Sequence, residues 1–208
     1  MTETIGGKAL RMRQDRDGED KPKRYKHTYR AVIEGDEKLL FSCDVVGHVT
    51  SNEICFLDGT GEASFSVRPN RKIMPTQWLV AGSSGREIGR VTQKILGKGI
   101  WVGFDASGAE VFRLVDYDSR VDKVGKSLFG GSSSRYGIAQ GNRLMATIAK
   151  EPREQTTKKG LRGLIQTFAT PSDWVIRFSP DAKDLDVRLI LPAMVLLIDF
   201  TVAMDSAS

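Results

Sequence analysis

The chain has 208 residues, with 31 basic and 26 acidic side chains and a formal net charge of +5 at pH 7. This length allows one domain or two small ones and is enough to bury a sizeable core. Its two cysteines, Cys43 and Cys55, exclude a disulfide framework and a multi-cysteine metal site, and they favour a reducing, cytoplasmic setting. The first twenty residues contain no apolar stretch, so no secretory signal is expected.

Basic residues are concentrated near the N-terminus. Positions 8–30 hold nine Lys and Arg residues against four Asp and Glu residues. We therefore expect residues 1–24 to form a basic, flexible arm, and residues 25–208 to form the folded domain. Such an arm suits anionic membrane lipids or nucleic acid, since each basic residue near a charged bilayer contributes about 1 kcal/mol.

From residue 53 onward one pattern repeats: an apolar run, a polar turn that contains glycine, and a second run of alternating polarity. The four turns read DGTG, GSSG, DASG and QGN. Asp, Asn and Ser side chains hydrogen-bond the turn backbone and Gly supplies a positive φ, so each unit is predicted to be a β-hairpin. Further strands are expected at 25–33, 39–46, 161–169 and 174–178, which brings the total to about twelve.

The C-terminal segment, from about 184 to 204, is predicted to be a helix that is apolar around nearly its whole circumference. Such a helix belongs in a protein core or in a membrane. A spanning helix needs about 20 predominantly apolar residues, whereas the longest charge-free run here is ten residues, 189–198. Asp199 would then lie inside the bilayer, where a carboxylate is costly. The core position is therefore favoured.

A closed barrel explains where this helix goes. Twelve antiparallel strands must protect their edges, and closure into a barrel removes the edges altogether. A barrel of this size encloses a lumen too wide for strand side chains alone to fill. We therefore expect a mainly β fold, a closed antiparallel barrel of about twelve strands around the helix. The helix positions expected in the core are Leu189, Leu191, Val195, Leu196, Leu197, Ile198, Asp199 and Phe200.

The C-terminal part of the chain resembles the phospholipid scramblases. Trp174, Ile176 and Phe178 match an aromatic-x-Ile-x-Phe strand, residues 185–187 match a Leu-Asp-Val phrase, and residues 197–200 match a helix end that reads Leu-Ile-Asp-Phe. The hairpins upstream are similar to a wider set that includes the plant LURP-one-related proteins and the tubby C-terminal domain. The resemblance covers about residues 25–208 and implies a tubby-like fold, a twelve-stranded barrel around a central hydrophobic helix.

The resemblance also implies a function. We expect a non-enzymatic, scramblase-like protein that associates reversibly with anionic phospholipid at a membrane surface, in the cytoplasm or peripheral at the membrane, with lipid translocation as the family's activity. The basic side chains expected to contact lipid headgroups are Arg68, Arg71, Lys72, Arg11, Arg13, Lys21, Lys23 and Arg24. The alternative is a soluble tubby-like binding module that takes a protein or nucleic-acid partner and transports no lipid.

Calcium is the one cofactor that the resemblance suggests, because the family's proposed calcium segment lies just before the helix. The aspartates near that position in this chain are Asp173, Asp181, Asp184 and Asp186. Their carboxylates are the hard oxygen ligands that calcium prefers, although the stretch lacks the Gly and Glu of an EF-hand loop. Asp184 and Asp186 have a second interpretation, since acidic residues at a helix start cap it and stabilise its dipole.

No motif in the chain indicates catalysis. The Gly125–Ser127 sequence GKS resembles part of a phosphate-binding loop, but the position that requires the earlier Gly is Arg120. The two histidines, His27 and His48, have no partner at metal-ligand spacing. The protein is therefore expected not to be an enzyme.

Overall fold

The structure, a computed structural model, describes residues 5–17, 26–46, 53–71, 75–94, 101–116, 136–152 and 172–205. Its strands are β1 (Ala9–Asp17), β2 (Lys26–Ile33), β3 (Leu39–Val46), β4 (Ile54–Asp58), β5 (Ala63–Pro69), β6 (Gln77–Gly82), β7 (Glu87–Gln93), β8 (Trp101–Asp105), β9 (Glu110–Asp116), β10 (Tyr136–Gln140), β11 (Arg143–Pro152) and β12 (Ser172–Phe178). A short 3-10 helix, η1 (Ala182–Asp184), leads into the helix α3 (Val187–Asp205).

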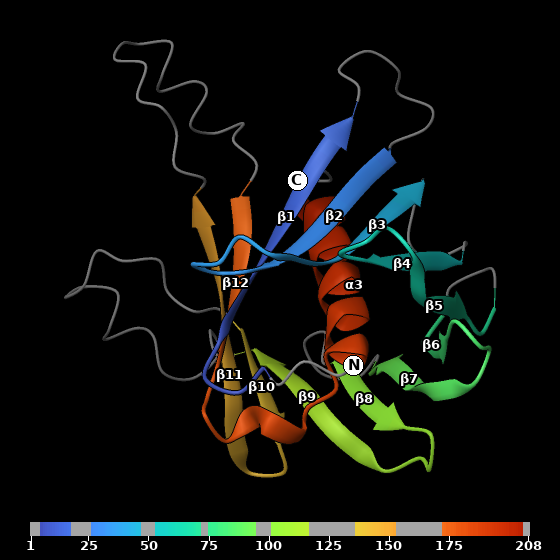
Figure 1. The fold of residues 1–208 in the computed structure, drawn as a ribbon. Helices are drawn as coiled ribbons and strands as arrows, with labels where there is room; N and C mark the ends of the chain where they lie inside the picture. Colours follow the sequence, from blue (N-terminus) through green and yellow to red (C-terminus); the bar gives the residue numbers. More distant parts are fainter. Residues whose placement is uncertain are drawn as a thin grey trace, which may run out of the picture.

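The twelve strands form one closed antiparallel barrel (Figure 1). Each strand from β2 to β12 pairs with its neighbour in the sequence, and β1 pairs with both β2 and β12. The predicted closed barrel is therefore confirmed, and closure leaves no strand edge unpaired along the ring.

The first strand corrects the expected domain boundary. Residues 1–24 were predicted to be a flexible arm, but β1 lies within this range and completes the barrel. Leu10 and Met12 point inward and are 0% and 1% exposed, while Arg11 and Arg13 alternate with them on the outer face. The positive charges are thus the solvent-facing half of an amphipathic strand. The predicted strand at 161–169 lies outside the described residues.

The hairpin turns form as the sequence predicted. In the β4–β5 turn, Asp58 Oδ1 accepts hydrogen bonds from the backbone N–H and the hydroxyl of Thr60, at 2.9 and 2.6 Å. In the β8–β9 turn, Asp105 makes the same pair of contacts with Ser107, at 2.9 and 2.6 Å. Both turns close with a glycine at φ 87°, in the region where glycine avoids the steric cost that other residues meet.

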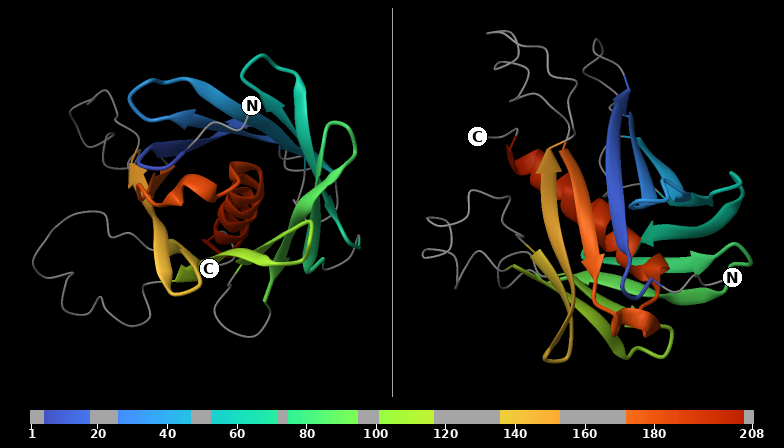
Figure 2. Two further views of the ribbon diagram at one scale, coloured as in Figure 1. Left: turned by 60° about the horizontal axis from the view of Figure 1, so that its bottom comes forward. Right: turned by 60° about the vertical axis from the view of Figure 1, so that its left-hand side comes forward.

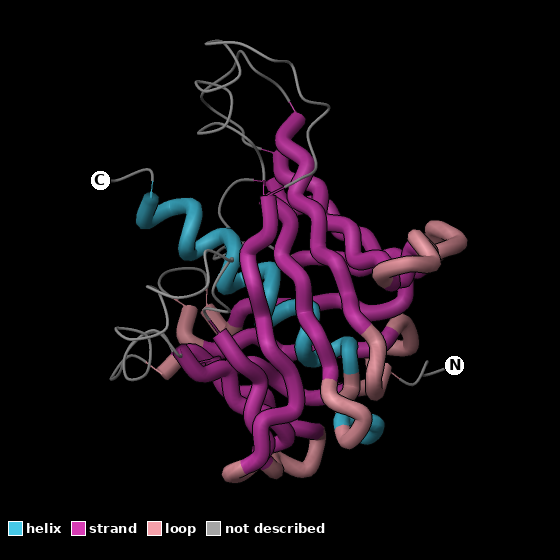
Figure 3. Tube along the Cα trace, turned by 90° about the vertical axis from the view of Figure 1, so that its left-hand side faces the viewer, coloured by secondary structure: helices cyan, strands magenta, loops and turns pink. Residues whose placement is uncertain are grey.

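The helix α3 lies inside the barrel and runs obliquely through it, as Figures 2 and 3 show from different sides. Its apolar residues from Leu189 to Ile198 are at most 5% exposed. Asp199 is only partly buried, and the side chain of Phe200 lies outside the described part. The predicted core helix is confirmed, with a start at Val187 instead of 184 because η1 forms a separate turn. Within the described residues, no helix is long and apolar enough to cross a membrane.

Large side chains from the strands fill the space between the barrel wall and the helix. Phe56 and Phe65 stack at 4.4 Å between ring centroids, and Trp78 and Trp101 approach to 5.2 Å. Phe112 covers Gly103, where an added Cβ would lie 2.0 Å from the ring. This packing joins the barrel wall and the helix into one core.

Candidate functional site

A cavity of about 960 Å³ lies beside the first turn of α3. We call it the mouth cavity. Four segments meet there: the chain before β1, the β2–β3 turn with the start of β3, the β4–β5 turn, and the start of α3. Its apolar lining residues are Ile5, Leu39, Leu40, Phe41 and Val187. Its polar lining residues are Lys38, Asp58, Thr60, Ser64 and Arg188, together with Gly59. The size is at the upper end of the roughly 300–1,000 Å³ that is usual for small-molecule sites.

The apolar side of the mouth cavity is formed by three consecutive residues of β3. The register between β2 and β3 shifts here, because Ala31 faces Phe41 but Val32 faces Leu39, so Leu40 is an extra residue. Such a bulge disturbs the strict alternation of a strand. All three side chains, Leu39, Leu40 and Phe41, are consequently only partly buried.

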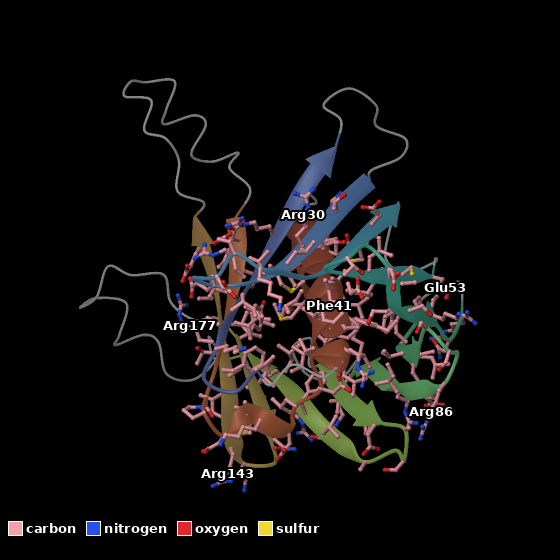
Figure 4. All side chains as sticks on the ribbon, in the orientation of Figure 1. Arg30, Phe41, Glu53, Arg86, Arg143 and Arg177 are labelled. Atoms are coloured by element: carbon pink, nitrogen blue, oxygen red, sulfur yellow. The ribbon has the colours of Figure 1, made fainter. Side chains whose placement is uncertain are left out.

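This apolar wall is supported by the core. The Phe41 ring meets the edge of Phe65 at 5.3 Å between centroids, and Phe65 stacks on Phe56. Phe65 and Phe56 are 1% and 2% exposed, and Phe41 packs against the core that surrounds α3 (Figure 4). Aromatic pairs in these geometries contribute about 0.5–1.5 kcal/mol beyond area burial. The wall therefore exists before any ligand binds.

The helix start contributes a positioned guanidinium. Nε and Nη2 of Arg188 donate to the carboxylate of Asp186, with the shortest contact 2.6 Å, and the same carboxylate accepts the backbone N–H of Arg188 at 2.9 Å. These hydrogen bonds raise the pKa of Arg188 above its ordinary value. Among the described residues Nη1 has no acceptor. Asp186 thus holds the guanidinium in place and leaves one side of it for a second anion.

The β4–β5 turn closes the other side of the mouth cavity. It sits tightly against β3, because a Cβ at Gly59 would lie 2.5 Å from the Leu39 carbonyl oxygen. Hydrogen bonds from Thr60 lower the pKa of Asp58 below its ordinary value. Asp58 is therefore an anion whose acceptor oxygen is already engaged in the turn. The hydroxyl groups of Thr60 and Ser64 remain as polar lining.

The predicted calcium ligands are not brought together. Asp173 is 2% exposed and lies on β12, where its Oδ2 is 3.5 Å from Arg11 and 3.4 Å from Arg13. Asp186 is bound to Arg188, while Asp181 and Asp184 are exposed around η1. Among the described residues, no group of three or more His, Cys, Asp or Glu side chains could hold a metal ion. Asp186 takes the alternative role that the sequence suggested, since it caps the helix start.

Two of the predicted headgroup-binding residues belong to an ion-pair network across the β1–β12 pair. Nη2 of Arg11 is 2.6 Å from Glu34 and 3.5 Å from Glu151, and Arg13 lies 3.1 Å from Glu37. Burial lowers the pKa of Arg11, but the hydrogen bond and charge of Glu34 raise it overall. We call this network, which also includes Asp173 and Arg177, the seam network. The arginines of this network stabilise the closure of the barrel between β1 and β12.

The remaining predicted headgroup contacts divide into two groups. Arg68 is exposed and lies 2.8 Å from Glu53, and Arg71 is exposed just beyond β5. Both are at the end of the β4–β5 hairpin opposite the turn that lines the mouth cavity. The others, Lys21, Lys23, Arg24 and Lys72, lie outside the described residues.

Sequence reasoning missed the residues that the fold gathers at the mouth cavity. Lys38 and Arg188 are 150 positions apart, and neither belongs to a motif that indicates a binding site. The one local signal was the apolar triplet of residues 39–41, which departs from strict alternation. No family model, no curated protein and no solved structure matches this chain. The chemistry of the site must therefore be inferred from its geometry alone.

That geometry suits an amphiphile. Lys38 and Arg188 provide two cationic groups, of which Arg188 is held rigidly, while Leu39, Leu40 and Phe41 provide a preformed apolar wall. Sites of this kind bind one apolar body and orient it through a few polar groups. The arrangement can bind an anion that is attached to an apolar group.

Proposed function

We propose that this protein is a non-enzymatic, scramblase-like barrel that associates reversibly with anionic phospholipid at a membrane surface. The observation that carries the proposal is the mouth cavity, where two cationic side chains lie beside three partly exposed apolar residues, and where Oδ1 of the lining carboxylate Asp58 is already hydrogen-bonded within its own turn. A membrane surface offers this combination, an anionic headgroup above an apolar layer. The closed barrel around a buried helix adds support, because the scramblase and tubby resemblance implies that architecture.

Exposed cations outside the cavity offer a second place for contacts with lipid headgroups. Arg68 and Arg71 are exposed at the end of the β4–β5 hairpin away from the mouth cavity, and among the described residues Arg68 forms one ion pair, with Glu53. Exposed ion pairs are worth little in water, so a phosphate group can compete for the Arg68 guanidinium. Bound lipid would be released at high ionic strength, since such surface charges are screened within about 10 Å at 0.1 M salt.

Vesicle flotation tests the proposal. Wild-type protein is expected to float with vesicles that contain phosphatidylserine at low salt, and to stay unbound with phosphatidylcholine vesicles. The Lys38→Gln/Arg188→Gln variant should bind roughly 30-fold more weakly, because each cation contributes about 1 kcal/mol. The Arg86→Gln/Arg143→Gln variant is the matched control, since it removes two cations that lie away from Phe41 at the periphery of the view in Figure 4. This control variant should lose less affinity for phosphatidylserine vesicles than the Lys38→Gln/Arg188→Gln variant loses.

Two results would contradict the proposal. The first is an absence of binding to both kinds of vesicle at low salt, which would favour the alternative, a soluble binding module with a protein or nucleic-acid partner. The second is equal loss of binding in the two double variants, which would show that net charge matters and the mouth cavity does not. A duplex DNA titration separates the nucleic-acid alternative, because its affinity would fall steeply with salt.

A further inference from the structure

We infer that the mouth cavity binds a single-chain anionic amphiphile, a molecule with one alkyl chain and one carboxylate or phosphate. The inference rests on the proposed function and names the ligand class of the same site. In the bound state the anionic group lies between Lys38 and Arg188, and the chain runs along Leu40 and Phe41 toward the first turn of α3.

The positions of the two cations determine how the ligand is oriented in the cavity. Arg188 is anchored through Nε and Nη2 to Asp186, so its remaining side is fixed at the helix start. Lys38 comes from the β2–β3 turn on a different segment of the cavity wall. Cations from two segments can hold one anionic group between them, and hydrogen bonds to charged groups of this type are shorter and stronger than neutral ones.

The apolar wall argues for an alkyl chain. Three consecutive side chains of β3 stay partly exposed at the cavity, and Ile5 and Val187 add nearly buried apolar surface from two further segments. Phe41 is braced by Phe65, so the surface does not need to rearrange. A purely hydrophilic anion would leave this surface uncovered, whereas an alkyl chain covers it.

The size of the cavity argues for one chain. A volume of about 960 Å³ suits a ligand of drug-like size, such as a fatty acid or a lysophospholipid. A phospholipid with two long chains is larger than the ligands that such pockets enclose. The cavity is therefore matched to a lipid with one chain, or to one chain that leaves the bilayer.

A chain-length series tests the inference, with octyl, decyl and dodecyl phosphate as probes below their micelle concentrations. Affinity is measured by calorimetry and by the shift in melting temperature, since a ligand that binds the folded state raises it. Each buried methylene should tighten binding about fourfold, or about 15-fold from octyl to decyl. Decanoate is expected to bind like decyl phosphate if the shared anionic chemistry suffices. If decanoate shows no measurable affinity, the site is restricted to phosphates, and the part of the inference that includes carboxylates is wrong.

Variants separate the two halves of the site. Lys38→Gln/Arg188→Gln should weaken binding of decyl phosphate at least tenfold, keep the chain-length dependence, and leave binding of the uncharged decyl maltoside unchanged. Leu40→Trp should fill the apolar side and abolish the chain-length dependence. Ser64→Leu narrows the cavity from β5 and is a second filling variant in case Leu40→Trp fails to fold. Leu79→Trp is the matched control, an exposed leucine on β6 outside the cavity lining.

The outcomes distinguish the inference from the proposed function. Affinity that does not depend on chain length, or that survives both filling variants, overturns the inference even when vesicles still bind. Saturable, chain-length-dependent binding without vesicle flotation supports the amphiphile site and overturns the membrane proposal.

Discussion

At the scale of single residues, two aspartates show how the sequence encodes a local structure with a pH dependence. Asp58 and Asp105 occupy equivalent positions in the β4–β5 and β8–β9 turns, and each accepts three hydrogen bonds from its own turn. The side-chain hydrogen bonds from Thr60 and Ser107 are the main reason that both pKa values lie below the ordinary value. The ionised form is therefore the one that stabilises the turns.

The lowered pKa values of these two aspartates predict that the protein becomes less stable at acidic pH. Because the folded-state pKa values are lower than those of the unfolded chain, the unfolded chain takes up protons first as the pH falls. The contribution is fully present above about pH 5 and is lost as the pH falls below about 4. In Asp58→Asn/Asp105→Asn, urea midpoints measured between pH 5 and 3 should change less than those of the wild type. The Asn Oδ1 keeps an acceptor in each turn, so the variant should still fold.

A control variant makes this result specific. Asp36→Asn removes one carboxylate from the exposed β2–β3 turn and should leave the wild-type pH dependence in place. An equal flattening of the pH dependence in the control and in the double variant would show that the turn hydrogen bonds are not its source.

At the scale of elements, the success of sequence reasoning depended on how local the signal was. The turns DGTG, GSSG and DASG contain their own hydrogen-bonding side chain or their own glycine, so the hairpins could be predicted from a few adjacent residues. The central helix was also predictable, because a helix that is apolar all round must be buried. The pairing of neighbouring strands follows from the hairpins, whereas the closing pairs of β1 with β2 and β12 do not.

The strand β1 was missed for a physical reason. Leu10 and Met12 alternate with Arg11 and Arg13, which is the pattern of a half-buried strand, but the density of charge around them indicated a solvated arm. The seam network explains the charge, since acidic residues of β11, β12 and the β2–β3 turn face those arginines. These partners are distant in sequence, as are Lys38 and Arg188, so neither the network nor the mouth cavity could be read from local patterns.

Deletion of residues 1–17 tests the role of β1. Because β1 pairs with β2 and β12, its removal would open the barrel, leave two unpaired edges and uncover the core. The shortened protein is expected to aggregate or to lose its cooperative melting transition, as measured by size-exclusion chromatography and circular dichroism. Deletion of residues 1–4 is the control, since it leaves Ile5 and β1 in place. A flexible arm predicts that both deletions leave the melting temperature unchanged.

At the scale of the whole molecule, the barrel and the helix depend on each other for burial. The helix side chains from Leu189 to Ile198 are shielded by the strands, and Trp78, Phe65 and Phe112 on the strands are 2% exposed or less. Neither part could bury its apolar surface without the other. The mouth cavity lies where the helix enters this shared core, so a ligand that bound there would raise the stability of the whole domain.

A charge placed in the helix distinguishes a core helix from a membrane anchor. Leu196→Asp places an unpaired charge at a residue that is 4% exposed. The substitution should lower the free energy of unfolding by several kcal/mol, out of a total of about 5–15 kcal/mol. Leu144→Asp, at a 43% exposed position of β11, is the matched control and should change the free energy of unfolding by about 0.5 kcal/mol at most.

Truncation after Lys183 extends the test to the whole helix. The truncated chain would enclose an empty apolar lumen, which must collapse or aggregate because the lining loses its packing partners. A membrane anchor predicts the opposite result, since a barrel without its anchor would stay folded and lose only its membrane attachment. A monomeric truncated protein with the wild-type β-sheet spectrum and a sharp melting transition would therefore show that the barrel is stable alone. The helix would then have to be explained by its function and not by the need to fill the barrel.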